Sequence, residues 1–168
     1  MILSRYKAMI IAAMLAGFIL KPAMAVEPGQ IAPEFALPGQ SDQVVRLSDY
    51  RDKVVYLYFW TSWCGTCVQA FPWLNEMQSK YGAKGLQIIA VDLDVKAEDA
   101  RNFLVENPAN FLVAMDTKAS TPAAYKIKAL HISLLIGPGG KVIARQAVVN
   151  DTDKSLVESG IRQALSGK

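Results

Sequence analysis

The feature that most constrains this chain is a pair of cysteines, Cys64 and Cys67, placed between an apolar run and a helical pattern. They are the only cysteines in the sequence. The preceding run, 53–60, is almost continuously apolar, which predicts a strand buried on both faces. Two thiols three residues apart at the start of a helix can close a disulfide and reopen it. The first sulfur also lies where the helix dipole favours a thiolate, so the pair indicates thiol–disulfide exchange.

Residues 1–25 have the pattern of a secretory signal peptide. Arg5 and Lys7 precede an apolar stretch, 8–20, and Ala23 and Ala25 flank Met24 as a small-x-small cleavage site. The stretch has 13 residues, whereas a membrane span needs about 20. We therefore expect export to the periplasm and a single mature domain of residues 26–168. The alternative is a membrane anchor formed by an uncleaved N-terminal segment.

Removing this peptide changes the charge balance. The whole chain has 18 basic and 15 acidic residues, and three of the bases (Arg5, Lys7 and Lys21) lie in 1–25, which leaves 15 of each sign. A formally neutral domain without a long basic run is not expected to bind nucleic acid. Its length suits one domain with a sizeable core.

Strands and helices are predicted to alternate along the rest of the chain. Short strands at 35–37 and 44–47 should pair as a hairpin around turn residues. A helix is expected from Cys64 to about Tyr81, kinked at Pro72, and Asp151 or Thr152 should cap the last helix, which ends near 165. The elements expected between them are strands at 86–91, 111–115, 132–136 and 141–149 and helices at 96–106 and 120–125. This order predicts an α/β fold with a mixed central sheet flanked by helices and an N-terminal β-hairpin extension.

Several segments resemble the thioredoxin superfamily, and within it the TlpA/ResA-like exported thiol–disulfide oxidoreductases. The resemblance covers nearly all of 26–168 and is carried by Tyr58-Phe59-Trp60-Thr61-Ser62-Trp63-Cys64-Gly65-Thr66-Cys67, Phe71-Pro72, Ile88-Ile89-Ala90-Val91-Asp92 and the segment 125–140. It implies a thioredoxin-like fold with Cys64–Cys67 as the redox-active disulfide. In the mechanism that we expect, Cys64 attacks a substrate disulfide and Cys67 resolves the product. The supporting residues are expected to be Trp63, Gly65, Thr66, Leu130 and His131.

Three positions depart from the family pattern. His131 takes the slot in which these proteins usually carry a cis-proline, and we predict a trans bond between Leu130 and His131 because a cis bond before a non-proline residue costs about 3 kcal/mol. Tyr58 stands where thioredoxins have a buried acid. Ala70 stands where ResA-like proteins have a glutamate. Both usual proton acceptors for the buried thiol are therefore missing.

His131, the only histidine, allows three interpretations. It could act as the general base for Cys67. It could complete a metal site with Cys64 and Cys67, because thiolate and imidazole suit Cu(I) or Zn(II). It could also be a partly exposed loop residue without a role. The second interpretation gives an alternative function, a Cu(I)- or Zn(II)-binding protein with a thioredoxin fold.

Other candidate residues have plainer interpretations. Asp92 and Asp94 follow a predicted strand and could support the site, but acids at strand ends are usually solvated or cap helices. Tyr58 is expected in the core, with its hydroxyl bonded to a backbone group or water. Trp63 and Trp73 are the candidates for a surface that docks a partner.

The resemblance also suggests the physiological setting. It favours a reductase of protein disulfides, supplied with electrons by a membrane thiol-reducing protein of the DsbD/CcdA type. Its expected partners are protein thiols and disulfides. We expect no organic cofactor and a monomeric protein.

Overall fold

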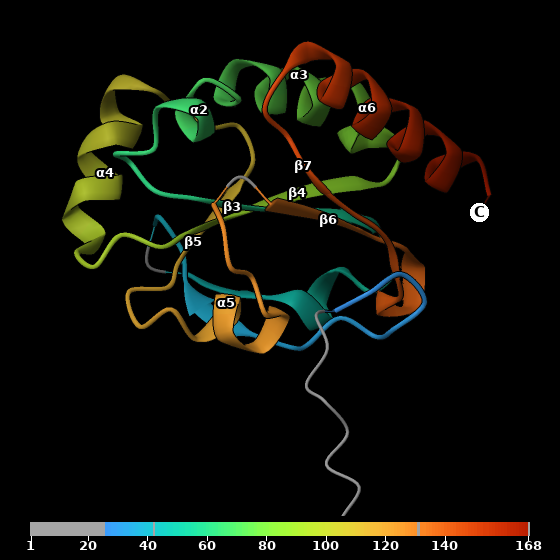
Figure 1. Cartoon of the computed structure of the whole chain (residues 1–168), viewed down its shortest axis with the longest axis horizontal. Helices are drawn as coiled ribbons and strands as arrows, with labels where there is room; N and C mark the ends of the chain where they lie inside the picture. The colour runs from blue at the N-terminus through green and yellow to red at the C-terminus, as the bar shows by residue number, and fades with distance from the viewer. Residues whose placement is uncertain (1–25, 42, 131, 168) are drawn as a thin grey trace, which may run out of the picture.

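A computed structural model describes residues 26–41, 43–130 and 132–167. Its centre is a five-stranded sheet with the strand order β5-β4-β3-β6-β7 (Figure 1). The strands are β3 (Val54–Trp60), β4 (Leu86–Asp92), β5 (Leu112–Met115), β6 (Ile132–Ile136) and β7 (Val142–Ala147). Strands β3, β4 and β5 run parallel, β6 is antiparallel to β3, and β7 is antiparallel to β6. The predicted mixed sheet is confirmed.

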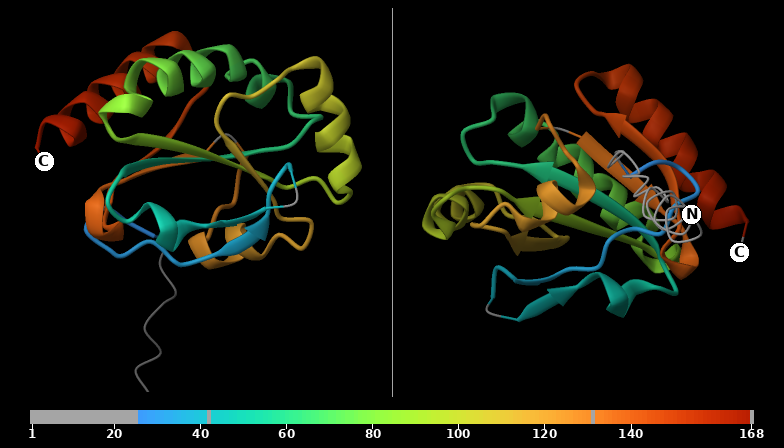
Figure 2. Two further views of the ribbon diagram at one scale, coloured as in Figure 1. Left: turned by 180° about the vertical axis from the view of Figure 1, so that it is seen from behind. Right: turned by 60° about the horizontal axis from the view of Figure 1, so that its bottom comes forward.

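Helices cover both faces of this sheet (Figures 1 and 2). One face carries α2 (Gly65–Val68), α3 (Phe71–Tyr81), α4 (Ala97–Glu106) and α6 (Asp151–Ser166), and the other carries α5 (Ser120–Tyr125). Short 3-10 turns are formed by Leu47–Tyr50, Gly82–Lys84 and Pro138–Gly140. Within 26–41, 43–130 and 132–167, no helix is both long and apolar enough to cross a membrane.

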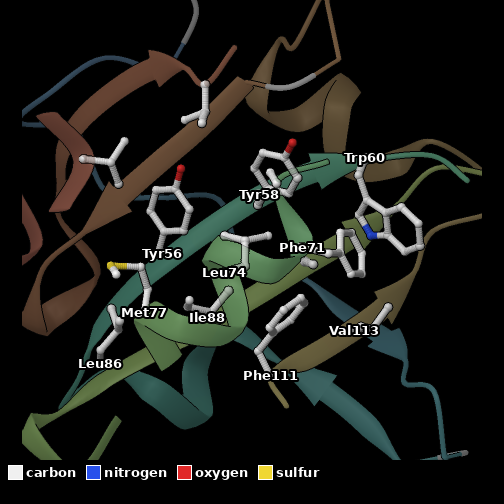
Figure 3. Packing of buried hydrophobic residues seen from close by; sticks show 14 of the residues in the cluster. Tyr56, Tyr58, Trp60, Phe71, Leu74, Met77, Leu86, Ile88, Phe111 and Val113 are labelled. Carbon is white, nitrogen blue, oxygen red and sulfur yellow. The ribbon is translucent and has the colours of Figure 1, made fainter. Parts of the chain in front are cut away.

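Strand β3 separates two cores because successive side chains point to opposite faces. All seven of its residues are buried, as the apolar run predicted. Tyr56, Tyr58 and Trp60 pack with α3, including Phe71 and Leu74 (Figure 3). The alternate β3 residues, Val55, Leu57 and Phe59, pack in the other core, which includes Leu37, Val45 and Tyr125.

The predicted helix from Cys64 to Tyr81 is wrong in one respect: it is two helices. The first, α2, ends at Val68, and α3 begins at Phe71 with Pro72 in its first turn. Proline has no N–H, and its ring would clash with the carbonyl four residues earlier, here that of Val68. Pro72 is therefore a helix start and not a kink within one helix.

The N-terminal segment forms the predicted hairpin and also reaches both edges of the sheet. β1 (Ala36–Pro38) pairs antiparallel with β2 (Val44–Arg46). At one sheet edge, Gly29 N–H donates to the Val142 carbonyl of β7 at 2.8 Å. At the other, Gln40 N–H donates to the Val113 carbonyl of β5 at 3.2 Å.

The last helix is capped one residue earlier than predicted. Asn150, and neither Asp151 nor Thr152, is the N-cap of α6. The Asn150 Oδ1 accepts from the Asp153 N–H at 3.0 Å, and the Asp153 Oδ2 accepts from the Asn150 N–H at 3.1 Å. This reciprocal pair satisfies two N–H groups that would otherwise lack partners.

Candidate active site

Cys64 and Cys67 lie where β3 gives way to α2, at the carboxyl end of a central strand, as the sequence predicted. They are joined by a disulfide, with their Cα atoms 5.2 Å apart. Cys64 is the N-cap of α2 and has an extended backbone, and its carbonyl accepts from the Val68 N–H at 3.0 Å. The chain thus turns into a helix directly at the first sulfur.

The two cysteines differ in their access to solvent. Cys64 is half-buried, whereas Cys67 is completely buried in the core beneath α2 and α3. An incoming disulfide can therefore approach Cys64 and not Cys67. This difference is the one that a nucleophilic and a resolving cysteine require.

The break after Val68 weakens the prediction that a helix dipole stabilises the Cys64 thiolate. The helix beginning beside Cys64 has only four residues, Gly65–Val68. A macrodipole sums over aligned peptide units, so α2 supplies a smaller field than the predicted helix through Tyr81 would. Stabilisation of a Cys64 thiolate must therefore come more from local N–H groups than the sequence suggested.

The expected supporting residues near the disulfide differ in their exposure to solvent. Trp63 is 73% exposed, Gly65 and Thr66 are exposed, and Leu130 is half-buried against the core that contains Cys67. The Thr66 Oγ1 lies 3.6 Å from the Cys64 Sγ. His131 and its bond to Leu130 lie outside the described residues, so the trans bond and the three interpretations of His131 stay predictions.

Tyr58 forms a hydrogen bond with the backbone of Cys67. Its hydroxyl donates to the Cys67 carbonyl at 3.2 Å, and the side chain is fully buried, which confirms the predicted core position. Burial raises the pKa of Tyr58 far above its ordinary value. The residue in the slot of the usual buried acid is therefore a hydrogen-bond donor and not a proton acceptor near neutral pH.

Trp73, the other tryptophan predicted to face a partner, lies partly inside. It is half-buried and packs edge-on against Tyr56, with ring centroids 6.0 Å apart. Trp63 is thus the more exposed of the two candidates. Trp60 and Phe71 are core residues with ring centroids 4.7 Å apart.

Asp92 and Asp94 are the residues that sequence reasoning undervalued. The expectation that they are solvated or cap a helix is wrong: they are 0% and 2% exposed. Asp92 ends β4 and pairs in register with Trp60, and the Asp94 Oδ2 accepts from the Ser62 N–H at 2.9 Å. The available signal was their spacing, two acids directly after a strand that pairs beside β3.

Elsewhere within residues 26–41, 43–130 and 132–167, metal-ligating side chains do not gather into a site. Among the described residues, no three His, Cys, Asp or Glu side chains form a group that could hold a metal ion. The alternative site of Cys64, Cys67 and His131 includes a residue outside the described ranges, so it stays untested.

The sequence is similar to those of known proteins. Residues 27–165 match the family profile described as Redoxin. The chain is 33% identical over 138 residues to the thiol-disulfide oxidoreductase ResA of Bacillus thuringiensis subsp. konkukian, which covers 82% of this chain and 79% of the relative.

The fold is also similar to those of solved structures. A crystal structure of a candidate thiol:disulfide interchange protein DsbE from Chlorobium tepidum matches with a TM-score of 0.81 at 49% identity, covering 84% of this chain and 99% of that one. The thioredoxin domain of a thiol-disulfide oxidoreductase from Bacteroides vulgatus matches with a TM-score of 0.73 at 23% identity, over 82% and 99% of the two chains. The second match supports the fold alone. The predicted thioredoxin-like fold is confirmed.

Proposed function

The chain belongs to the Redoxin family and is a thiol–disulfide oxidoreductase, and on this premise we propose that it is an exported reductase of protein disulfides. The observation that supports exchange at this pair is the unequal access of the two sulfurs in one disulfide, with Cys64 half-buried and Cys67 buried, and the family resemblance supports the reductase direction. The described state is then the oxidised product of one turnover.

The proposed reaction begins with the reduced pair. The Cys64 thiolate attacks one sulfur of a substrate disulfide, the substrate S–S bond breaks, and the leaving thiolate takes up a proton. Cys67 then loses its proton and attacks the Cys64 Sγ, which breaks the mixed disulfide and releases the second substrate thiol. Two electrons have passed from the cysteine pair to the substrate, and the Cys64–Cys67 disulfide has formed.

Each turnover must be followed by re-reduction of the pair. A membrane thiol-reducing protein of the DsbD/CcdA type is the donor that we propose, by the same exchange chemistry in reverse. Loss of the Cys67 proton needs an acceptor, and burial keeps the Tyr58 hydroxyl protonated. His131 stays the candidate for this role.

Substrate proteins are proposed to dock on the apolar surface beside Cys64. Trp63 offers the most exposed aromatic ring there. A pocket of about 170 Å³ has Leu93, Ile127 and Leu130 in its lining. Leu130 packs against the same core as Cys64, whereas Leu93 and Ile127 pack against the other core, so Leu130 is the lining residue that would link the pocket to the cysteine site.

Export is supported by the signal-peptide pattern of residues 1–25. Cleavage after Ala25 would leave Val26 as the first residue. N-terminal sequencing of protein recovered from the periplasm should begin at Val26. A membrane-bound product that retains residues 1–25 would instead support the uncleaved anchor.

A redox titration tests the direction of electron flow. The metal-free protein is equilibrated in dithiothreitol or glutathione buffers, and the free thiols are alkylated and counted. A potential near or below about −270 mV supports a reductase, and one near about −120 mV points to an oxidase. A pair that closes reversibly only after metal is stripped would favour Cu(I) or Zn(II) binding, which His131→Ala should then abolish.

A further inference from the structure

Two buried acids lie directly behind the loop that leads to Cys64. β3 and β4 are parallel neighbours, and the last β3 residue, Trp60, pairs with Asp92. The loop 61–63 leaves β3 at this point, and Asp94 lies two residues beyond β4. Neither acid has a place in the proposed electron transfer, although both are buried.

The acids form a chain of hydrogen bonds that ends on the loop. The Asp94 N–H donates to the Asp92 Oδ1 at 3.2 Å. The Asp94 Oδ2 accepts from the Ser62 N–H at 2.9 Å. Two residues later the chain reaches Cys64, whose N–H donates to the Thr61 carbonyl at 3.2 Å. Asp94 is therefore tied to the turn that sets the position of the Cys64 backbone.

One oxygen of Asp92 has no hydrogen-bond partner among the described residues. This atom, Oδ2, is inaccessible to solvent. The carboxyl groups of Asp92 and Asp94 interact, but two carboxylates can only accept hydrogen bonds. A proton on Asp92 turns the contact into a donor–acceptor pair and leaves a single buried charge, which is much less unfavourable than two.

The electrostatic surroundings favour this protonated form. The pKa of Asp92 is raised to about 8, mainly by burial and further by the negative charge of Asp94 and the interaction between the two carboxyl groups. Within this shift, the hydrogen bond from the Asp94 N–H lowers the pKa, and Asp99, an exposed acid of α4, makes the smallest contribution that raises it. The charged groups that shift Asp92 are thus both acids.

Asp116 follows the neighbouring strand β5, and its pKa is shifted in the opposite direction from that of Asp92. It is also buried, but its carboxylate accepts from the N–H and hydroxyl groups of Ser120 and Thr121. Burial alone would raise the pKa of Asp116, but these four hydrogen bonds outweigh burial and lower it. Burial at the end of a strand is therefore not sufficient to raise the pKa of a carboxyl group.

We propose that Asp92 and Asp94 are positioning residues of the redox site, with Asp92 holding a proton so that the Asp94 carboxylate can hold the Ser62 N–H and with it the loop to Cys64. The proposal rests on Cys64 being the nucleophile of the proposed function. Loss of the Asp92 proton places two negative charges side by side in the core. Repulsion then displaces Asp94, the bond to Ser62 is lost, and the loop before Cys64 shifts.

The direct test follows the Ser62 amide by NMR in the oxidised protein, in which the cysteines do not titrate. In the wild type its chemical shift should change with a midpoint near pH 8. Asp92→Asn cannot ionise, so this transition should disappear, whereas Asp99→Asn removes an exposed acid from the same surroundings and should retain it. Absence of the transition in the wild type, or its persistence in Asp92→Asn, would overturn the proposal whatever the direction of electron flow proves to be.

A second test measures reactivity. Asp94→Ala removes the acceptor of the Ser62 N–H, and the alkylation rate of Cys64 in the reduced protein at pH 7 should change by about tenfold, as for loss of a hydrogen bond to a charged group. Asp92→Asn keeps a donor to Asp94. The alkylation rate of Cys64 in this variant should therefore stay within about twofold of the wild-type rate, well below the roughly tenfold change expected for Asp94→Ala. Equal rates in Asp94→Ala and the wild type would refute the positioning role. If Asp94→Ala does not fold, Asp94→Asn, with a neutral and weaker acceptor, should show a smaller change in the same direction.

Discussion

Replacing Asp92 by asparagine should change how the stability of the protein depends on pH. The pKa of Asp92 is about 8 in the folded state, against 3.8 for the free side chain. Between these values the folded protein holds a proton that the unfolded chain has released. Rising pH therefore favours unfolding, and this contribution to the free energy of unfolding falls from about pH 4 to pH 8. The asparagine side chain does not titrate, so the variant lacks this slope.

The size of the effect follows from the linkage relation. Each pH unit within the window changes the contribution by about 1.4 kcal/mol. The difference in unfolding free energy between Asp92→Asn and the wild type should thus shift in favour of the variant by about 3 kcal/mol from pH 5 to pH 7. All other titrating groups are shared by the two proteins, and those that do not interact with Asp92 cancel in the difference.

Urea unfolding of both oxidised proteins at pH 5, 6, 7 and 8 measures this difference. Asp99→Asn is the matched control, since it removes an exposed acid and should follow the wild type closely. Parallel stability curves for Asp92→Asn and the wild type would refute the reasoning, because they would mean that Asp92 is ionised in the folded protein as in the unfolded chain.

Three further substitutions test the packing around the site. Tyr58→Phe removes the buried donor to the Cys67 carbonyl and should lower the unfolding free energy by about 1–2 kcal/mol in urea; an unchanged value would mean that the bond contributes nothing. Phe71→Ala opens a cavity beside Trp60 and should destabilise the protein by about 3–5 kcal/mol, which calorimetry would detect as a lower Tm. Asn150→Ala removes the cap of α6 and should lower the unfolding free energy by about 1 kcal/mol, with Asn150→Asp near wild type; equal losses in both would contradict the capping argument.

The central strands could be predicted because their sequence pattern is local. An apolar run as long as β3 has few alternatives to a strand buried on both faces. The cysteine pair was likewise identifiable from spacing and from its place after this run. Both features depend on residues close together in the chain.

The features that were missed depend on contacts between distant segments or on fine local competition. The burial of Asp92 and Asp94 follows from the pairing of β4 beside β3, which no short stretch of sequence specifies. A proline within a helical pattern can either kink one helix or begin a second one, and the sequence around Pro72 did not distinguish these two outcomes. The choice of Asn150 over Asp151 as the N-cap is a difference of one residue between two good capping side chains.

The hydrogen bonds of the N-terminal segment to both sheet edges have a consequence for the order of folding. Strands at the edge of a sheet expose unpaired backbone groups that can recruit another chain. The groups on β5 and β7 that Gln40 and Gly29 contact belong to strands made late in synthesis, whereas the contacting segment is made first. The covering segment is therefore already available when each edge strand is made, so neither edge has to stay exposed once its strand has formed.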